Sequence, residues 1–408
     1  MRIGVGAILE PQLGWVWLSQ KERRTAELAL AEFGPDGTRD ELGFGVIHFG
    51  YADRFFPGTS VQHTKLRYIW FVCWSYLELQ QRFGGEAFQK AELDRIEDRT
   101  GQKLLRHYGI DDGNGIIGGR VLRVGRSPIV KPSAVYWNAM RTWGLVRPLS
   151  VGRDAPGRGE LHSRWPDLTA KHGRPEVDPD QSTSIFFDPP PVPSRWRSQS
   201  EPLTFDLDNK HDEAGRILRA WAVPRDALGR RSLLYRLAER GGATPTSIIS
   251  PSVLALCDED EKVSLRRAAC AGSLAAISRA IHTALVQRLK DSNSDANTTM
   301  RRWLDDAVQQ HGEQAAKLDR LGLLVDVPEA SKLIPLIEAT QAWLSAGAGE
   351  ISPLEDVYRS REEAQKPGRA LLARSGGDRR VNWSPREPVP LTYRWERVTG
   401  FLDQLEGR

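Results

Sequence analysis

A short turn followed by basic residues contains the side chains best suited to bind an anion. Residues Pro57–Ser60 (PGTS) are typical of a turn that precedes a helix, and two basic residues follow early in that predicted helix. Backbone N–H groups at a helix N-terminus attract phosphates and carboxylates. Helix capping explains the two hydroxyl groups equally well. The predicted anion-binding residues are Thr59, Ser60, Lys65 and Arg67.

Acidic side chains near the same turn supply the materials for an enzyme. Arg39, Asp40 and Glu41 precede the turn, and Asp53 lies just before it. Carboxylates and arginines beside an anion-binding turn can act on a phosphate ester or on nucleic acid, provided that the fold brings them together. The residue types therefore fit such an enzyme, although the sequence does not fix their geometry.

The sequence predicts neither a metal site nor a cofactor. Its eight histidines are scattered, and its three cysteines form no Cys-x-x-Cys pair. One dinucleotide-type match, Gly113-x-Gly115-x-x-Gly118, follows a predicted helix, whereas the glycines of a dinucleotide site follow a strand and open a helix. We therefore interpret these glycines as part of a loop.

The most unusual feature of the sequence is a stretch without Asp or Glu, residues 113–153, called here the acid-free stretch. With 53 acids in 408 residues, roughly five would be expected in it. It holds seven Arg and Lys residues, and such an excess of positive charge suits phosphate groups. A predicted helix within it, Ser133–Trp143, resembles the last helix of a winged helix-turn-helix. The predicted nucleic-acid contacts are Arg120, Arg123, Arg126, Lys131, Tyr136, Arg141 and Arg147.

Composition is that of an ordinary globular protein that needs no disulfides. With 408 residues, a net charge of +4 and only three cysteines, the chain is expected to form two or three packed units in the cytoplasm. Its first residues lack the pattern of a signal peptide. The most apolar run, Tyr68–Leu77, has about half of the roughly 20 residues that a membrane span requires, so we expect no membrane partner.

Helices are expected to position the candidate residues in an N-terminal unit, residues 1–150. Ser19 and Glu22 are spaced as in a capping box, before a helix that ends near Phe33. The next predicted helix, Val61–Phe83, is apolar on almost every side and should form the buried centre. The unit is completed by a helix at Glu86–Tyr108, a short strand at Val121–Val124 and the helix Ser133–Trp143.

The rest of the chain is predicted to be a polar connection followed by a helical half. Residues 151–205 are rich in Gly, Pro, Asp and Ser, which predicts a long loop or linker. Residues 206–345 predict a helical domain, and residues 346–408 an Arg-rich C-terminal segment. The acidic run Asp258–Glu261 should complement a helix N-terminus. The fold class is mainly α, with several domains, and the later helices are expected at Asp212–Val223, Arg231–Arg240, Lys262–Lys290, Thr298–Leu321, Ala330–Ser345 and Trp395–Leu405.

Several segments together resemble a bacterial family of conserved proteins known only as a domain of unknown function. The resemblance is most specific between Thr38 and Trp74, and it extends with gaps over most of the chain. It implies no catalytic residues, but it does imply an association with anti-phage defence clusters. The matching segments are Thr38–Gly43 (TRDELG), Asp53–Ser60 (DRFFPGTS), Thr64-x-x-Arg67-Tyr68 with Phe71 and Trp74, Ile117–Arg120 (IGGR), Tyr136-Trp137 with Trp143-Gly144, and Tyr393-x-Trp395.

These features support three alternative functions. The first is a non-enzymatic subunit of a multi-protein system that binds nucleic acid or acts as a scaffold, with the basic residues of the acid-free stretch as phosphate contacts. The second is an enzyme acting on nucleic acid or a phosphate ester, using Asp40, Glu41, Asp53 and the Pro57–Ser60 turn. The third is a protein-binding adaptor without affinity for nucleic acid. The sequence does not predict the oligomeric state.

Overall fold

The protein is mainly helical, as predicted from its sequence. The computed structural model describes residues 40–109, 114–150, 152–170, 185–198 and 201–407. These residues form seventeen α-helices and several short 3-10 helices, and their only β-structure consists of two isolated bridges. The predicted helix that ends near Phe33 lies outside the described residues.

Helix α3 (Tyr68–Phe83) is the buried centre of the N-terminal helices, as its apolar sequence predicts. It contacts α4 (Lys90–Tyr108) and α6 (Pro132–Thr142). The prediction that this helix begins at Val61 is wrong. The backbone N–H groups of Thr64 and Lys65 donate to the hydroxyl of Tyr136, at 2.8 and 3.0 Å, instead of entering a helix. Similarly, α4 begins at Lys90, later than the predicted Glu86.

The predicted strand at Val121–Val124 is also wrong, because these residues belong mostly to a short helix, α5 (Gly119–Arg123). Leu122 is buried against α4, and a Cβ atom at Gly101 would collide with its side chain. Gly101 therefore allows α4 and α5 to approach closely, and α4 continues through it. The described residues contain no β-hairpin, so the wing of a winged helix-turn-helix is not confirmed, although α6 forms nearly as predicted.

Residues 151–205 are not simply a linker, which corrects the prediction from composition. Their described parts contain α7 (Arg158–Ser163), α8 (Trp165–Thr169) and a 3-10 helix at Ser194–Trp196. Apolar residues spaced among the polar ones reach the core, as Trp165 and Trp196 show. The indole N–H of Trp196 donates to Oε2 of Glu78 at 2.8 Å, and that of Trp165 to the carbonyl of Phe83 at 3.3 Å.

The second half is organised around one long helix, α12 (Glu259–Lys290), which packs along α13 (Ala296–Ala316). Its most apolar part is long enough to cross a membrane by length and composition, but 83% of that part is buried inside the protein, as in a core helix. The other helices of this half are α9 (Glu213–Trp221), α10 (Leu233–Arg240), α11 (Pro251–Leu254), α14 (Arg320–Asp326), α15 (Ile334–Ser345), α16 (Glu355–Gln365), α17 (Gly377–Val381) and α18 (Trp395–Leu405).

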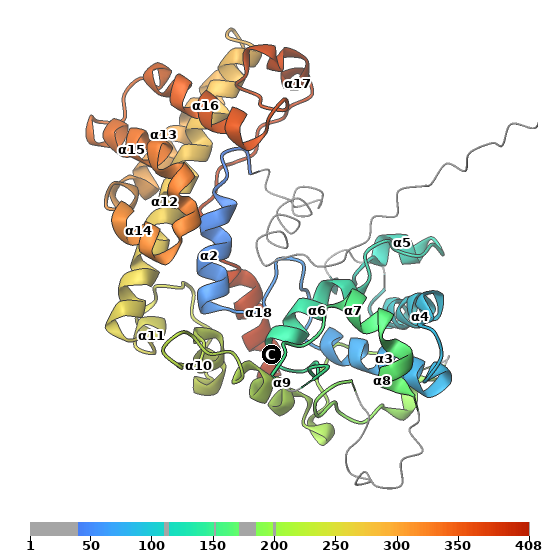
Figure 1. The fold of residues 1–408 in the computed structure, drawn as a ribbon. Helices are drawn as coiled ribbons and strands as arrows, with labels where there is room; N and C mark the ends of the chain where they lie inside the picture. The colour runs from blue at the N-terminus through green and yellow to red at the C-terminus, as the bar shows by residue number, and fades with distance from the viewer. Residues whose placement is uncertain (1–39, 110–113, 151, 171–184, 199–200, 408) are drawn as a thin grey trace, which may run out of the picture.

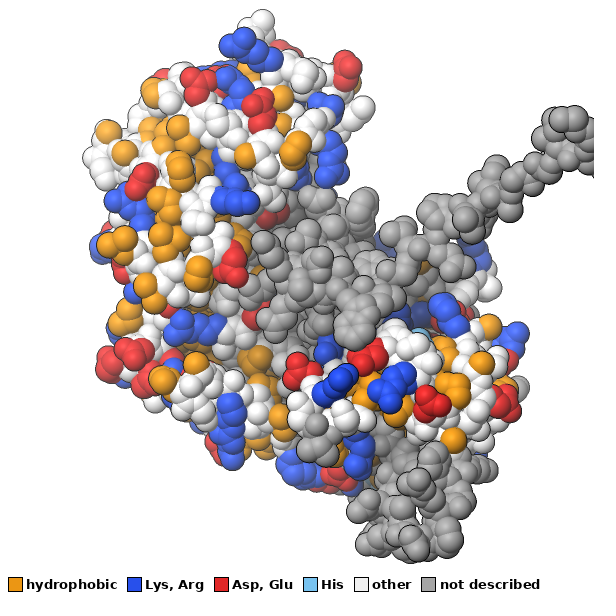
Figure 2. Space-filling model, in the orientation of Figure 1, with side chains coloured by type: hydrophobic (Ala, Val, Ile, Leu, Met, Phe, Trp, Pro, Cys, Tyr) orange, Lys and Arg blue, Asp and Glu red, His pale blue; other side chains and the backbone are white. Residues whose placement is uncertain are grey.

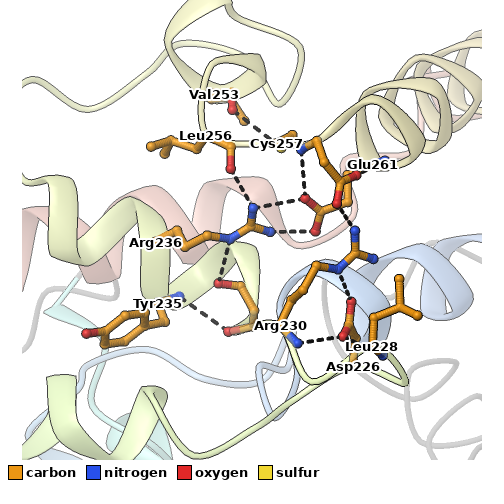
Figure 3. Close-up of polar contacts among 11 residues, drawn as sticks. Asp226, Leu228, Arg230, Tyr235, Arg236, Val253, Leu256, Cys257 and Glu261 are labelled. Carbon is orange, nitrogen blue, oxygen red and sulfur yellow. Dashed lines mark hydrogen bonds and ion pairs between the residues drawn. The ribbon is translucent and has the colours of Figure 1, made fainter.

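The acidic run Asp258–Glu261 complements the start of α12, as predicted. Asp258 and Glu261 form a capping box, in which each side chain accepts the backbone N–H of the other residue. Figure 3 shows that Glu261 also faces Arg236 of α10, whose two terminal nitrogens lie 2.5 and 2.9 Å from its carboxylate oxygens. The run therefore joins α10 to α12.

Each half of the chain contributes a helix that contacts the other half. Helix α2 (Gly45–Phe55) contacts α12 and the 3-10 helix Pro328–Leu333, and lies beside the second half in Figure 1. Conversely, Gln404 of α18 accepts the backbone N–H of Leu66 through its Oε1 atom at 2.8 Å. The buried apolar residues accordingly form one connected cluster rather than one for each half.

Candidate functional site

The Pro57–Ser60 turn does not present an anion-binding helix N-terminus. Thr59 is buried, and its backbone N–H and hydroxyl both donate to the carbonyl of Phe56, at 3.2 and 2.7 Å. The backbone N–H of Ser60 donates to Nδ1 of His63 at 3.2 Å. The donors that would hold an anion are thus used inside the protein, and α3 begins only at Tyr68.

The two basic residues predicted for that site also contact other groups of the protein. Arg67 is 1% exposed, and its Nη2 lies 2.9 Å from Oε1 of Glu213, which joins the start of α3 to the start of α9. Its Nη1 donates to the carbonyl of Thr204 at 3.1 Å. Lys65 is half-buried, with its Nζ 6.0 Å from the ring centre of Phe205. The structure therefore does not bring the predicted anion-binding residues together.

The carboxylates proposed for an enzyme are separated as well. Asp40 accepts two backbone N–H groups at the start of α2, from Phe44 and Gly45, both at 2.7 Å. Glu41 pairs with Lys366 at 2.7 Å, whereas Asp53, near the other end of α2, pairs with Nη1 of Arg394 at 2.7 Å. An 11-residue helix is roughly 16 Å long, at about 1.5 Å per residue. The described residues thus do not form the proposed catalytic group, and Arg39 lies outside them.

Asp40 and Glu41 instead line a small cavity of about 90 Å³ beside Arg279 and His282. Nε2 of His282 lies 3.2 Å from Oε1 of Glu362, which also accepts the backbone N–H groups of residues 371 and 372 at 2.9 and 2.8 Å. Burial opposes ionisation of Glu362, but the nearby imidazole of His282 and the hydrogen bonds from the two amides outweigh it and lower its pKa. This arrangement attaches the segment before α17 to α12.

The middle of the acid-free stretch is part of the core. Tyr136 is fully buried, and its hydroxyl donates to the carbonyl of Lys65 at 2.8 Å, so its ring is not available for stacking on a base. Lys131 is 6% exposed and forms an ion pair with Asp98. Ser133 donates its backbone N–H to the buried Glu97 at 2.6 Å. Two of the predicted nucleic-acid contacts are therefore structural in this conformation.

The beginning of the stretch, in contrast, is exposed. Arg120, Arg123 and Arg126 lie on α5 and the loop after it, and we call them the α5 ridge. The structure records no side-chain hydrogen bond or ion pair between Arg123 or Arg126 and any described residue. Elsewhere on the face seen in Figure 2, Lys and Arg are interleaved with Asp and Glu. The ridge is thus a local group of exposed guanidinium groups within an acid-free segment.

The end of the stretch lines another, larger cavity, a cleft of about 610 Å³. Arg141 and Arg153 belong to the acid-free stretch, and Arg216 and Arg219 come from α9; we call this site the arginine cleft. Two aspartates, Asp154 and Asp188, also line it, so its four arginines leave a net charge of +2. Its apolar floor is made by Trp143, Leu145, Val146, Phe187, Ala220 and Val223.

Three of the four arginines contact other groups of the protein. Nε of Arg141 donates to the carbonyl of Ala155 at 2.8 Å, and Nε of Arg216 to the carbonyl of His211 at 3.2 Å. Arg219 pairs with Asp212 at 2.9 Å. Arg153 is exposed, and no side-chain partner is recorded for it in the described chain. The cleft therefore combines three partnered guanidinium groups with an exposed one for which no partner is recorded in the described chain.

The floor of the cleft depends on close packing between α6 and α9. Gly144 has a φ of +69°, and a Cβ atom there would lie 3.0 Å from Cγ1 of Val223. The side chain of Arg147 lies over the ring of Phe187, with 4.4 Å between the guanidinium carbon and the ring centre. Phe187 and Val223 are 42% and 53% exposed, so they offer apolar surface beside the arginines.

Sequence reasoning found part of this cleft and missed the rest. It identified Arg141 and placed Arg153 in the acid-free stretch, whereas Arg147, also predicted, does not line the cleft and lies over the ring of Phe187. It missed Arg216, Arg219, Phe187 and Asp188. The only local signal was the spacing of the two arginines, one helical turn apart on α9. Their position opposite the end of α6 follows from tertiary packing, which this spacing does not reveal.

Comparisons with known proteins find a similarity to one family over part of the chain and no activity. Residues 11–154 match the sequence model of a family of unknown function (DUF6361), which covers the first third of the chain, including the acid-free stretch. No curated protein and no solved structure matches the chain. Within the part of the chain that the structure describes, no group of His, Cys, Asp and Glu side chains is arranged to hold a metal ion.

Proposed function

We propose that this protein is a non-enzymatic, nucleic-acid-binding or scaffold subunit of a multi-protein system. The observation that supports this proposal is the α5 ridge, where Arg123 and Arg126 are exposed and have no recorded partner among the described residues. Exposed guanidinium groups neutralise phosphates and release counterions from nucleic acid. The family resemblance of its N-terminal segments further supports a role in anti-phage defence.

The ridge suits contacts with the sugar-phosphate backbone better than it suits reading of bases. Its side chains are arginines separated by aliphatic residues, Val121 and Val124, and the aromatic residues of the acid-free stretch are buried in the core. Backbone contacts set position and affinity, whereas sequence is read at base edges. We therefore expect binding that depends strongly on salt and weakly on sequence.

Fluorescence anisotropy with a labelled 20-nucleotide strand and the corresponding duplex tests the proposal. The double variant Arg123→Glu/Arg126→Glu should bind at least about tenfold more weakly than the wild type, and the slope of log K against log salt should fall by about two. Affinity that is independent of salt, or unchanged in this variant, would overturn the proposal.

A matched control is available on the other half of the protein. Arg301 and Arg302 lie on exposed turns of α13, so Arg301→Glu/Arg302→Glu makes the same change in net charge away from the ridge. This control should retain nearly all of the wild-type affinity. An equal loss in both double variants would mean that net charge, rather than the ridge, determines binding.

A further inference from the structure

We propose that the arginine cleft binds a nucleoside monophosphate unit, and that the carboxylate of Asp188 occupies the place of its phosphate in the unliganded protein. This inference goes beyond nucleic-acid binding at the α5 ridge and does not rest on it. Figure 1 shows α5 and α9 on different sides of the N-terminal group of helices, so the two sites can be tested separately.

The size and lining of the cleft suit such a ligand. A volume of about 610 Å³ lies within the range of roughly 300–1,000 Å³ that is typical of small-molecule sites. The exposed ring of Phe187 and the side chain of Val223 can cover one face of a planar base. Arginines in the same cleft are suited to phosphate, because a planar guanidinium group donates two parallel hydrogen bonds to it.

Asp188 already makes, within the protein, the contacts that a phosphate would make. Nη1 of Arg216 forms an ion pair with Oδ1 of Asp188, and Nη2 of Arg219 lies 3.6 Å from Oδ2. One carboxylate thus bridges two guanidinium groups from consecutive turns of α9. A phosphate carries more negative charge and more acceptor oxygens than this carboxylate, so it can compete for both arginines.

The backbone at Asp188 is in an unusual conformation for this contact. Its φ is +42°, in the left-handed region that residues other than glycine enter at a cost. Its side chain is 64% exposed and belongs to the segment Asp188–Pro191 (DPPP). An exposed carboxylate contributes little to stability through ion pairs, so displacing it from the arginines costs little.

Isothermal titration calorimetry with the four nucleoside 5′-monophosphates tests the proposal on the full-length protein. Asp188→Asn should bind them about three- to tenfold more tightly than the wild type, because the competing charge is removed. Arg216→Gln/Arg219→Gln should lose binding. Adenosine and ribose 5-phosphate should each bind more weakly than adenosine monophosphate, since each lacks one of the two recognised parts.

Asp154→Asn is the matched control, because Asp154 lines the same cleft and carries the same charge. No side-chain hydrogen bond or ion pair of Asp154 with a described residue is recorded. This variant should bind with nearly wild-type affinity. An equal gain in Asp154→Asn and Asp188→Asn would overturn the specific role of Asp188. Absence of binding in both the wild type and Asp188→Asn would overturn the site.

Two further measurements separate the sources of the ligand and the two sites. A tetranucleotide with a 5′-phosphate, compared with the same strand without it, distinguishes a strand end from a free nucleotide, and binding of either ligand supports the cleft. The variant Arg123→Glu/Arg126→Glu should keep its affinity for monophosphates. If this variant keeps the wild-type affinity for both the monophosphates and the 20-nucleotide strand, the proposed function fails and the cleft proposal stands.

Discussion

The α5 ridge lies at the beginning of the acid-free stretch, whereas the arginine cleft combines Arg141 and Arg153 from its later part with Arg216 and Arg219 of α9. The arginines of the two sites are in different surroundings. At the ridge, Arg123 and Arg126 extend into solvent without a recorded partner in the described chain. In the cleft, Arg141 is held by the carbonyl of Ala155, and Arg216 by Asp188. An excess of charge in a sequence therefore marks a surface as basic but does not show whether the charges are free or arranged around a particular shape.

This comparison predicts that the stability lost on removing an arginine follows the degree to which the arginine is partnered. The largest loss is expected at Arg67, which is 1% exposed and forms a buried ion pair with Glu213. Arg67→Met should lower the free energy of unfolding by about 3–5 kcal/mol, because it leaves Glu213 buried without its counter-charge. Urea unfolding measures this loss.

The double variant Arg67→Met/Glu213→Gln supplies the control for that measurement. It removes both charges, so it should recover part of the stability lost in the single variant. If Arg67→Met unfolds at the same urea concentration as the wild type, burial of the ion pair does not determine how much the pair stabilises the protein.

The next largest effect concerns Glu97, which holds the buried middle of the acid-free stretch in place. Burial raises the pKa of Glu97 to about 7, although hydrogen bonds from Ser133 oppose the shift. A carboxyl group whose pKa is raised on folding stabilises the protein at low pH, and this contribution is lost as the pH rises from about 4.5 through 7. At about 1.4 kcal/mol per pKa unit, the loss is on the order of 3 kcal/mol.

Glu97→Gln should remove this pH dependence. The difference in unfolding free energy between the variant and the wild type should shift in favour of the variant as the pH rises from 4 to 8. Comparing the two proteins cancels the titration of other groups, which both share. A difference that stays constant over this range would mean that folding does not raise the pKa of Glu97.

A smaller loss of stability is expected for Arg216, an arginine of the cleft that has partners within the protein. Arg216 is 20% exposed and donates to Asp188 and to the carbonyl of His211. Arg216→Gln should lower the free energy of unfolding by about 1–2 kcal/mol, because it removes partly exposed hydrogen bonds to a charged group. Thermal unfolding followed by circular dichroism measures it, and a loss as large as that of Arg67→Met would remove the distinction between the cleft and the core.

The smallest effect is expected at the ridge. Arg123→Gln/Arg126→Gln should change the unfolding free energy by less than about 0.5 kcal/mol, as for most surface substitutions. The same samples can be compared in nucleic-acid binding, where the effect should be large. Marked destabilisation here would show that the ridge arginines have structural contacts and would weaken their assignment as binding residues.

The sequence predicted elements wherever local signals were strong. Helix α18 has the predicted bounds, and α6 differs only slightly, because Pro132 starts it and Gly144 follows its end. The start of α3 was misplaced, because Tyr136, distant in sequence, binds the backbone of Thr64 and Lys65. The strand at Val121–Val124 was wrong, since β-branched residues favour a strand only where another strand can pair with them.

The candidate sites were predictable only in part, because they too depend on contacts between residues distant in sequence. The acid-free stretch could be recognised from composition, but the burial of Tyr136 and Lys131 within it depends on contacts with residues far along the chain. Residues 151–205 looked unable to order themselves, yet Trp165 and Trp196 are buried against α3 and its end. Arg216 and Asp188 meet only because α9 packs beside this segment.

Because helices α2 and α18 each contact the other half of the chain, the two halves are not expected to fold as separate fragments. A fragment ending near residue 205 would retain α2 but lose the α12 surface that it covers, and would leave Leu66 without Gln404. A fragment starting there would keep α18 beside α10 but would lack Phe56 and His63, whose rings lie 5.7 and 6.1 Å from those of Trp395 and Phe401. Each piece would display apolar surface normally hidden, so separately expressed halves should aggregate, and co-expression of both should restore solubility.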